Sequence, residues 1–147
     1  MINTEFIKSS HPDFDKVKQI RTEVFTYEQG ANVGEEFDGF DSDEKTLYAL
    51  VYKDGEPSAT GRIAELSPQC CKIGRIAVKK SQRGYGLGKV LVESLLKKCY
   101  DLGYKTVKVD SQLHAVDFYK KSGFTPTGEK TIIDRGIEHL PMQMTED

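Results

Sequence analysis

Residues 73–89 read IGRIAVKKSQRGYGLGK, and this stretch decides how the rest of the chain is interpreted. An apolar, β-prone run enters a loop in which every second position is glycine, and a helix-favouring run follows. The loop glycines are Gly84, Gly86 and Gly88. Glycines at this spacing let the backbone approach a ligand closely while several N–H groups point together from a helix N-terminus. With Arg83 and Lys89 alongside, the loop is predicted to bind a phosphate or pyrophosphate.

Two other interpretations of the loop fit less well. A P-loop would need glycine at position 83 and Ser or Thr at position 90, but the chain has Arg83 and Val90 there. The dinucleotide motif G-x-G-x-x-G begins at Gly84 but meets Lys89 at its third glycine, with Asp110 as the available acidic partner. A nucleotide-binding oxidoreductase domain therefore stays as a weaker alternative. Glycines that only permit a tight strand-to-helix turn are the purely structural alternative.

Outward from this loop, hydrophobic periodicity predicts an α/β (α+β) fold in which helices lie on the faces of a mixed sheet. Three helices are expected. The first opens at residues 11–13, and the third covers residues 115–121. The second follows Gly88, and its apolar face carries Leu91, Leu95, Cys99 and Leu102. Turns are expected at residues 54–55 and 134–136. Strands are predicted at residues 3–8, 46–53, 58–66, 71–78, 106–110, 124–133 and 139–144.

Composition limits the class of protein. The chain has 147 residues, 37% of them hydrophobic, and a net charge of -2, which favours one folded domain over residues 1–147 and argues against disorder. No stretch approaches the roughly 20 apolar residues of a membrane span, and the N-terminus lacks a signal-peptide pattern, so we expect a cytoplasmic protein without membrane contact. The basic residues around the glycine loop form too short a run to predict nucleic-acid binding. The three cysteines, Cys70, Cys71 and Cys99, are interpreted as reduced thiols, and no metal-binding spacing is present.

Charge is unevenly distributed. Residues 35–44 carry six acidic side chains, and they form either a solvated loop or a surface that steers a cationic amine towards the protein. Arg62 and Arg75 fall on adjacent predicted strands, so they either face a substrate or pair with this acidic segment.

Two motifs together resemble the GCN5-related N-acetyltransferases (GNAT). Arg83-x-x-Gly86-x-Gly88, preceded by Ile76-Ala77-Val78, resembles the acetyl-CoA signature of that family. Residues 115–124, AVDFYKKSGF, resemble its later A-x-x-F-Y-x-x-x-G-F motif, in the right order and at the usual separation. The resemblance implies a mixed, mostly antiparallel central sheet of about six to seven strands flanked by helices. It also implies a bulge in the strand before the glycine loop.

The resemblance extends to the ElaA-like and YjcF-like branch over nearly the whole chain. The patterns that carry it are Arg21-x-x-Val24-Phe25-x-x-Glu28-Gln29, Glu36-x-Asp38-x-x-Asp41, Ser111-Gln112 and Gly136-Ile137-Glu138-His139. The chain departs from the branch at Glu138, where proline is common, and at Ser111, where alanine is frequent. These departures bear on the acceptor rather than on the cofactor.

The activity that the resemblance implies is transfer of an acetyl group from acetyl-CoA to a primary amine of a small molecule or peptide, by direct attack in a ternary complex. A non-catalytic acyl-CoA-binding module is a further alternative, and the protein is expected to be a monomer or homodimer. Tyr119 matches the general acid, with a pKa that needs little perturbation, although Phe118 and Tyr119 also fit a helix face in the core. The expected cofactor-binding residues are Ile76, Ala77, Val78, Arg83, Gly84, Tyr85, Gly86, Leu87, Gly88, Lys89, Gln112 and Phe118.

The sequence defines the residues that would bind the acceptor less clearly. Phe25, Glu28, Gln29, Arg75 and Gln112 are the expected substrate-binding side chains. The general base is left open among Glu28, Glu36, Asp110 and a water chain.

Overall fold

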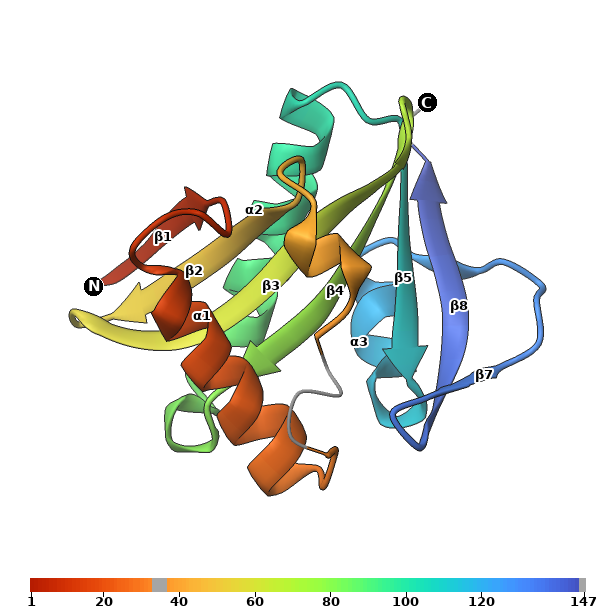
Figure 1. Ribbon diagram of the computed structural model, residues 1–147. Helices are drawn as coiled ribbons and strands as arrows, with labels where there is room; N and C mark the ends of the chain where they lie inside the picture. Colours follow the sequence, from red (N-terminus) through yellow and green to blue (C-terminus); the bar gives the residue numbers. More distant parts are fainter. Residues whose placement is uncertain (33–36, 146–147) are drawn as a thin grey trace.

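The computed structural model describes residues 1–32 and 37–145. Figure 1 shows a sheet with helices on both of its faces. The strands are β1 (Ile2–Ile7), β2 (Leu47–Lys53), β3 (Glu56–Ser67), β4 (Cys70–Val78), β5 (Thr106–Gln112), β6 (Thr125–Pro126), β7 (Ile132–Asp134) and β8 (Ile137–Thr145). The α-helices are α1 (Phe14–Arg21), α2 (Leu87–Asp101) and α3 (Val116–Lys121). A π-helix, η1 (Thr22–Glu28), continues α1, and short 3₁₀ turns occupy η2 (Gly39–Ser42), η3 (Lys80–Gln82) and η4 (Leu113–Ala115).

The sheet is mixed and mostly antiparallel, as predicted. Over the described residues its order is β1-β2-β3-β4-β5-β8-β6, with β7 also pairing to β8, and the one parallel pair in that order is β4 with β5. A doubly wound dinucleotide-binding sheet would instead be largely parallel. The fold therefore gives no support to the oxidoreductase alternative.

Two apolar cores lie on opposite faces of this sheet. In Figure 1, α1 crosses the near face of β2 and β3, while α2 and α3 lie behind the sheet. The predicted face of α2 is confirmed for Leu91, Leu95 and Cys99, each of which is fully buried. Leu102 was predicted on the same face but is 49% exposed, because α2 ends at Asp101 and Leu102 already belongs to the helix cap.

The predicted continuous strand over residues 124–133 is wrong. The structure has only β6, of two residues, and β7, of three, and both pair with β8. Pro126 lacks an N–H for a ladder hydrogen bond, and Gly128 turns the chain at a φ of +91°. The other predicted strands are present with boundary shifts of a few residues.

A wedge opens between β4 and β5, and it positions the functional site. The two strands pair only over three residues of each, where residues 70–72 face residues 106–108, and Figure 1 shows them diverging beyond that point. Near the start of the wedge, Arg75 and Ile76 of β4 both stand opposite Gly61 of β3, which is a β-bulge. The bulge that the resemblance implies is therefore present. Gly61 is needed there because a Cβ would lie 2.9 Å from the Leu95 side chain of α2.

The three cysteines are free thiols, as interpreted from the sequence. Cys71 of β4 and Cys99 of α2 are buried, with their Sγ atoms 3.3 Å apart. A hydrogen bond with Cys71 and burial both raise the pKa of the Cys99 thiol. Over the described residues, no helix is long and apolar enough to cross a membrane.

Candidate active site

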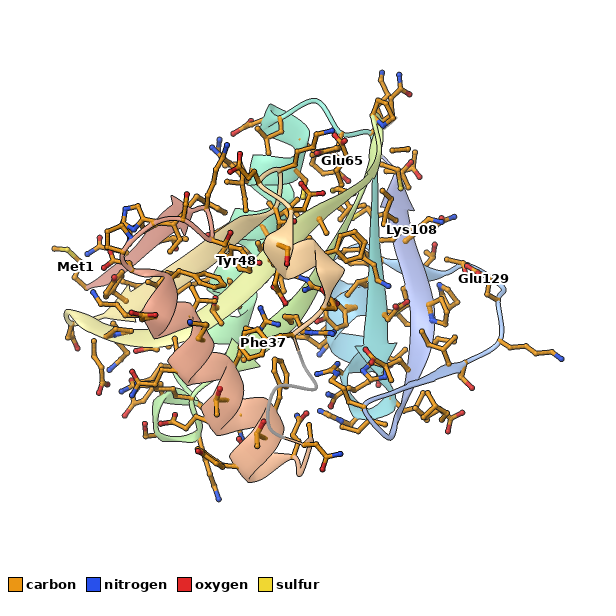
Figure 2. All side chains as sticks on the ribbon, viewed as in Figure 1. Met1, Phe37, Tyr48, Glu65, Lys108 and Glu129 are labelled. Carbon is orange, nitrogen blue, oxygen red and sulfur yellow. The ribbon has the colours of Figure 1, made fainter. Side chains whose placement is uncertain are left out.

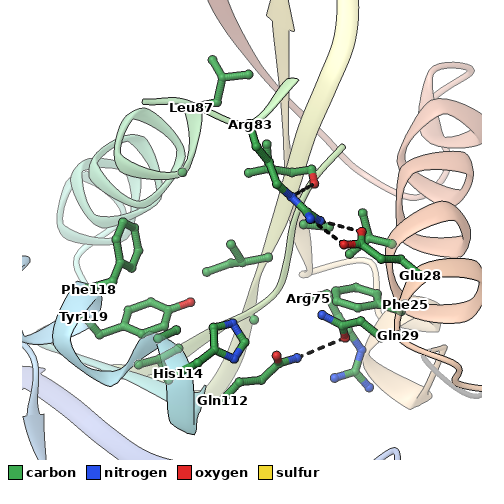
Figure 3. Close-up of a pocket in the computed structure, with 18 of the residues that line it drawn as sticks. Phe25, Glu28, Gln29, Arg75, Arg83, Leu87, Gln112, His114, Phe118 and Tyr119 are labelled. Atoms are coloured by element: carbon green, nitrogen blue, oxygen red, sulfur yellow. Dashed lines mark hydrogen bonds and ion pairs between the residues drawn. The ribbon is translucent and has the colours of Figure 1, made fainter. Parts of the chain in front are cut away.

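The wedge holds a cavity of about 650 Å³ between the glycine loop, the N-terminal helices and α3. Figure 3 shows residues from all three regions pointing into this space. Every sequence-predicted cofactor or substrate residue lines the cavity except Tyr85. Tyr85 is 59% exposed, and its ring packs under the Lys53 ammonium, with Nζ 4.0 Å from the ring centroid.

The glycine loop is shaped to receive a ligand at the start of α2. Gly86 is the N-cap of α2 with a φ of +76°, and no side chain caps the first-turn N–H groups of this helix. These N–H groups lack partners within the helix itself. A Cβ built at Gly84 or Gly86 would meet no protein atom within 4 Å, so the space beside both glycines is open. The backbone geometry suits the close approach of an anion, as the sequence predicts.

Tyr119 combines the two interpretations made from the sequence. Its ring is part of the core, in edge-to-face contact with Phe118 and Phe124, and the side chain is only 7% exposed. Its hydroxyl nevertheless points into the cavity in Figure 3. Burial raises the pKa of Tyr119 well above its usual value of 10.0, a shift that the acid role did not require. A phenol in this state keeps its proton at neutral pH and is available as a donor.

Glu28 and Arg83 form an ion pair across the cavity mouth. Two Arg83 nitrogens donate to the Glu28 carboxylate at 2.5 and 2.6 Å, and Arg83 Nε also donates to the Val78 carbonyl. Hydrogen bonding to Arg83 holds the pKa of Glu28 below its usual value. The guanidinium is therefore engaged with the π-helix, and a carboxylate in this state is a weak proton acceptor.

The other predicted substrate residues connect β5 with the N-terminal helices. Gln112 Nε2 donates to Gln29 Oε1 at 3.2 Å, a hydrogen bond drawn in Figure 3. Phe25 lines the same side of the cavity. Of the two remaining base candidates, Asp110 is ion-paired with Lys72, and Glu36 lies outside the described residues.

Two of the described acidic residues around η2, Asp38 and Asp41, form an ion network with arginines, whereas Asp43 and Glu44 are exposed. Arg21 binds Asp41 in a bidentate pair at 2.7 and 3.0 Å. Arg62 binds Asp38 in the same way at 2.8 and 2.7 Å, and Arg75 reaches Asp38 at 3.1 Å. Arg62 and Arg75 both pair with the acidic segment, which is the second of the two alternatives. Arg75 also lines the cavity, which fits the first alternative, a side chain that faces the substrate. Arginines match the charges of Asp38 and Asp41, but Asp43 and Glu44 are exposed, and Glu35 and Glu36 lie outside the described residues. Both alternatives for the acidic segment therefore stay open.

Tyr48 completes this network from β2. Its side chain, labelled in Figure 2, is fully buried, and its hydroxyl donates to Asp41 Oδ1 at 2.6 Å. Burial alone would raise the pKa of Asp41, but the hydrogen bonds and charge of Arg21, together with Tyr48, hold that pKa far below 3.8.

The substitution Tyr48→Phe is expected to lower the free energy of unfolding at pH 7 by about 2 kcal/mol, because it removes a buried hydrogen bond to a charged acceptor. The folded pKa of Asp41 lies below its unfolded value of 3.8, so the stabilisation by this carboxylate is complete above that pH. The stabilisation is lost as the pH falls through the folded pKa, and the difference between wild type and variant should shrink there. Urea unfolding from about pH 7 to about pH 2 measures this.

The matched control is Tyr52→Phe, whose hydroxyl donates to the Glu5 carboxylate across a longer distance of 3.4 Å at a less buried site. This control should change the free energy of unfolding by less than about 0.5 kcal/mol. A Tyr48 effect that grew towards low pH would contradict the account.

Several residues that line the cavity were not predicted as site residues from the sequence, among them Arg135 and His139. Arg135 stands in the turn between β7 and β8, where the sequence showed only a turn signal. His139 lines the cavity from β8, and burial lowers its pKa, which favours the neutral imidazole. No local motif marks Arg135, and the Gly136–His139 pattern gave His139 no role. Long-range strand pairing brings both side chains to the wedge.

Comparison with known families bears directly on this geometry. The family model described as "Acetyltransferase (GNAT) domain" matches residues 11–146. The chain belongs to the GNAT acetyltransferase family. It is a GNAT N-acetyltransferase, as the two motifs around Gly86 and Tyr119 indicated.

Individual GNAT relatives cover most of the chain. It is 35% identical over 123 residues to the uncharacterized N-acetyltransferase YjcF of Bacillus subtilis, covering 84% of this chain and 86% of YjcF. It is 33% identical over 129 residues to protein ElaA of Escherichia coli, covering 84% and 82% of the two chains. The crystal structure of ElaA superposes with a TM-score of 0.85 at 27% identity, covering 97% of this chain and 99% of ElaA.

A more distant GNAT structure carries a ligand. The crystal structure of a GNAT family acetyltransferase from Elizabethkingia anophelis with acetyl-CoA bound superposes with a TM-score of 0.68. The identity is 15%, and the match covers 99% of this chain and 98% of the other. At this identity, the likeness is one of fold.

Proposed function

We propose that residues 1–147 act as one domain that transfers an acetyl group from acetyl-CoA to a primary amine of a small molecule or peptide. The observation that carries this proposal is the wedge cavity, which joins an open glycine loop at the N-terminus of α2 to the inward-pointing Tyr119 hydroxyl. Acetyl-CoA supplies an acyl group activated as a thioester. GNAT relatives bind it, and the protein from Elizabethkingia anophelis has it bound in its crystal structure.

The residues of the loop fit the diphosphate of such a carrier. Gly84 and Gly86 leave their surroundings open, and the uncapped first turn of α2 offers N–H donors. Lys89 lines the same part of the cavity and adds positive charge. The β4 bulge at Arg75 and Ile76 interrupts the regular ladder with β3 beside the cavity, and bulges re-aim groups of a strand next to active sites. Donors fixed in this way can orient a thioester carbonyl and stabilise the negative charge that develops on its oxygen.

Tyr119 is the proposed general acid. Its raised pKa keeps the phenol protonated, and its hydroxyl points into the cavity, so it can deliver a proton to a departing thiolate. Direct attack by the amine is favoured over a covalent acyl-enzyme, because none of the three cysteines lines the cavity and Cys71 and Cys99 are fully buried.

A thiol-release assay with acetyl-CoA tests the proposal across polyamines, amino sugars, amino acids and peptide N-termini. We expect release of CoA that depends on the amine, together with an N-acetylated product seen by mass spectrometry. Enzyme incubated with acetyl-CoA alone should gain no acetyl mass. Saturable binding of a reduced nicotinamide dinucleotide without amine-dependent CoA release would contradict the proposal and favour the oxidoreductase alternative.

A further inference from the structure

Arg135 is a buried cation with hydrogen-bonding capacity that the protein does not use. Its side chain is 7% exposed. Neither Nε nor Nη1 has a hydrogen-bond acceptor among the described residues, although both atoms are buried. Arg135 forms an ion pair with Asp134, whose Oδ2 lies 3.4 Å from Nε, and its charge helps to lower the pKa of Asp134. Buried donors without acceptors destabilise a fold, and they are uncommon in native structures.

The position of Arg135 connects these unused donors to the wedge cavity. Arg135 lines that cavity and also a smaller one of about 270 Å³ beside it. Its guanidinium carbon lies 4.8 Å from the centroid of the Phe25 ring, which is on the predicted substrate side. Figure 3 shows Phe25 across the cavity from Tyr119. The unused donors therefore lie on the wall that faces the proposed general acid.

Arg75 adds a second guanidinium to the same wall. It lines both cavities, and Figure 3 places it beside Gln29 on the Phe25 side. Asp134 links the two arginines, because its Oδ2 lies 3.3 Å from Arg75 Nη1 as well as close to Arg135. Burial and the positive charges of Arg135 and Arg62 lower the pKa of Arg75 to about 10. The electrostatic environment at this wall is thus one in which an added anion would be stabilised.

The backbone at both arginines is unusual. Arg75 has a φ of +49° and Arg135 a φ of +54°, in the left-handed region that non-glycine residues seldom adopt. Arg135 and Gly136 are the central residues of the two-residue β7–β8 hairpin turn, a turn that favours positive φ at both positions. Arg75 lies in the β4 bulge. The turn and the bulge thus place the two arginines on the lining of the same cavity.

We propose that the acceptor amine carries an anionic oxygen group, a carboxylate or a phosphate, which Arg135 binds through its unused donors. The planar guanidinium fork matches the paired oxygens of such groups. The identity of this ligand as the acceptor rests on the proposed acetyl transfer. The amine end of the acceptor extends from Arg135 towards Tyr119, and Phe25 packs against the chain between them. The substrate class is therefore amino acids or amino phosphates rather than polyamines.

Matched acceptors test this proposal. Each amino acid is compared with its carboxamide, which lacks the anion, and with its aminophosphonate analogue. Wild type should have a kcat/KM at least about tenfold higher for the anionic form than for the carboxamide. Arg135→Gln should remove this preference by raising KM for the anion, while the carboxamide changes less than about twofold. Preference between carboxylate and phosphonate identifies which anion the site takes.

Two further variants sharpen the comparison. Arg135→Lys keeps the charge but loses the fork, and it should retain part of the preference. Lys130→Gln removes one exposed charge near the same hairpin without touching either cavity, and it should behave as wild type. Equal use of carboxylate and carboxamide by wild type, or an equal loss for both in Arg135→Gln, would overturn the proposal and leave acetyl transfer standing.

A binding measurement separates the two proposals if no amine is acetylated. Calorimetric titration with acetate and with inorganic phosphate is carried out on wild type, Arg135→Gln and Gly86→Val. Binding that is lost in Arg135→Gln but kept in Gly86→Val supports the Arg135 anion site, while the transferase proposal fails. Binding absent from wild type, or unaffected by Arg135→Gln, overturns the anion site as well.

Discussion

Replacing Tyr119 with phenylalanine is expected to lower kcat for acetyl transfer by about a hundredfold or more, which is the usual contribution of a positioned general acid. Acetyl-CoA affinity should be kept, because the phenylalanine ring preserves the edge-to-face contacts with Phe118 and Phe124. Steady-state kinetics and calorimetric titration of acetyl-CoA measure the two effects separately. An unchanged kcat would exclude the acid role of Tyr119.

The pH dependence gives a second readout for Tyr119. Its pKa is raised above 10.0, so the phenol stays protonated throughout the neutral range, and the ratio of wild-type to variant kcat should be constant from about pH 6 to about pH 9. Tyr104→Phe is the matched control. Burial also raises the pKa of Tyr104, but its hydroxyl donates to Glu65 at 3.0 Å, outside the cavity. This control should leave kcat unchanged.

Replacing Gly86 with valine is expected to weaken acetyl-CoA binding by about a hundredfold. A branched side chain would occupy the open space beside the N-terminus of α2 and block the approach of a diphosphate to its N–H groups. Loss of two such charge-assisted hydrogen bonds corresponds to about 3 kcal/mol, or roughly two decades of affinity. Calorimetric titration with CoA and acetyl-CoA measures the change.

Valine at this φ of +76° also strains the backbone, so the control must carry the same strain. Gly55, in the β2–β3 turn, has a φ of +82°, and a Cβ there would likewise meet no protein atom within 4 Å. Gly55→Val should lower the melting temperature by a similar amount but keep acetyl-CoA affinity. Equal affinity losses in the two variants would show that strain, rather than obstruction of the loop, is responsible.

The sequence predicted most of the elements correctly, because local signals specify them. The glycine pattern indicated the start of α2, whereas Leu102, predicted on its buried face, is the C-cap and is exposed. The prediction for the region after α3 was wrong, because β6 and β7 together look in sequence like one long β-prone run. Pro126 lies at the end of β6, and Gly128 lies between the two strands. Strand pairing with β8, not local preference, determines where those strands begin and end.

Most residues that the sequence predicted for the site line the cavity, and their roles in binding cofactor or acceptor stay predictions. Gly86 and Tyr119 belong to compact motifs, whereas Arg135 stands alone in a turn and reaches the cavity through the tertiary fold. The partners of the ion pairs could not be predicted from the sequence either. Arg83 and Glu28 are 55 residues apart in sequence, and Arg62 and Asp38 are 24 apart, so neither pairing could be deduced from spacing. Burial, which raises the pKa of Tyr119, is likewise a property of the assembled core.

The short pairing between β4 and β5 has a consequence for solubility. An unpaired strand edge on a protein surface recruits strands of other molecules and promotes aggregation. Here the longest interruption of the ladder lies inside the wedge, where β4 and β5 diverge after three paired residues. On the outer side of β8, β6 and β7 are only two and three residues long. The unpaired backbone of β4 and β5 thus lines a small-molecule cavity, and β1, with six residues, forms the longer edge of the sheet.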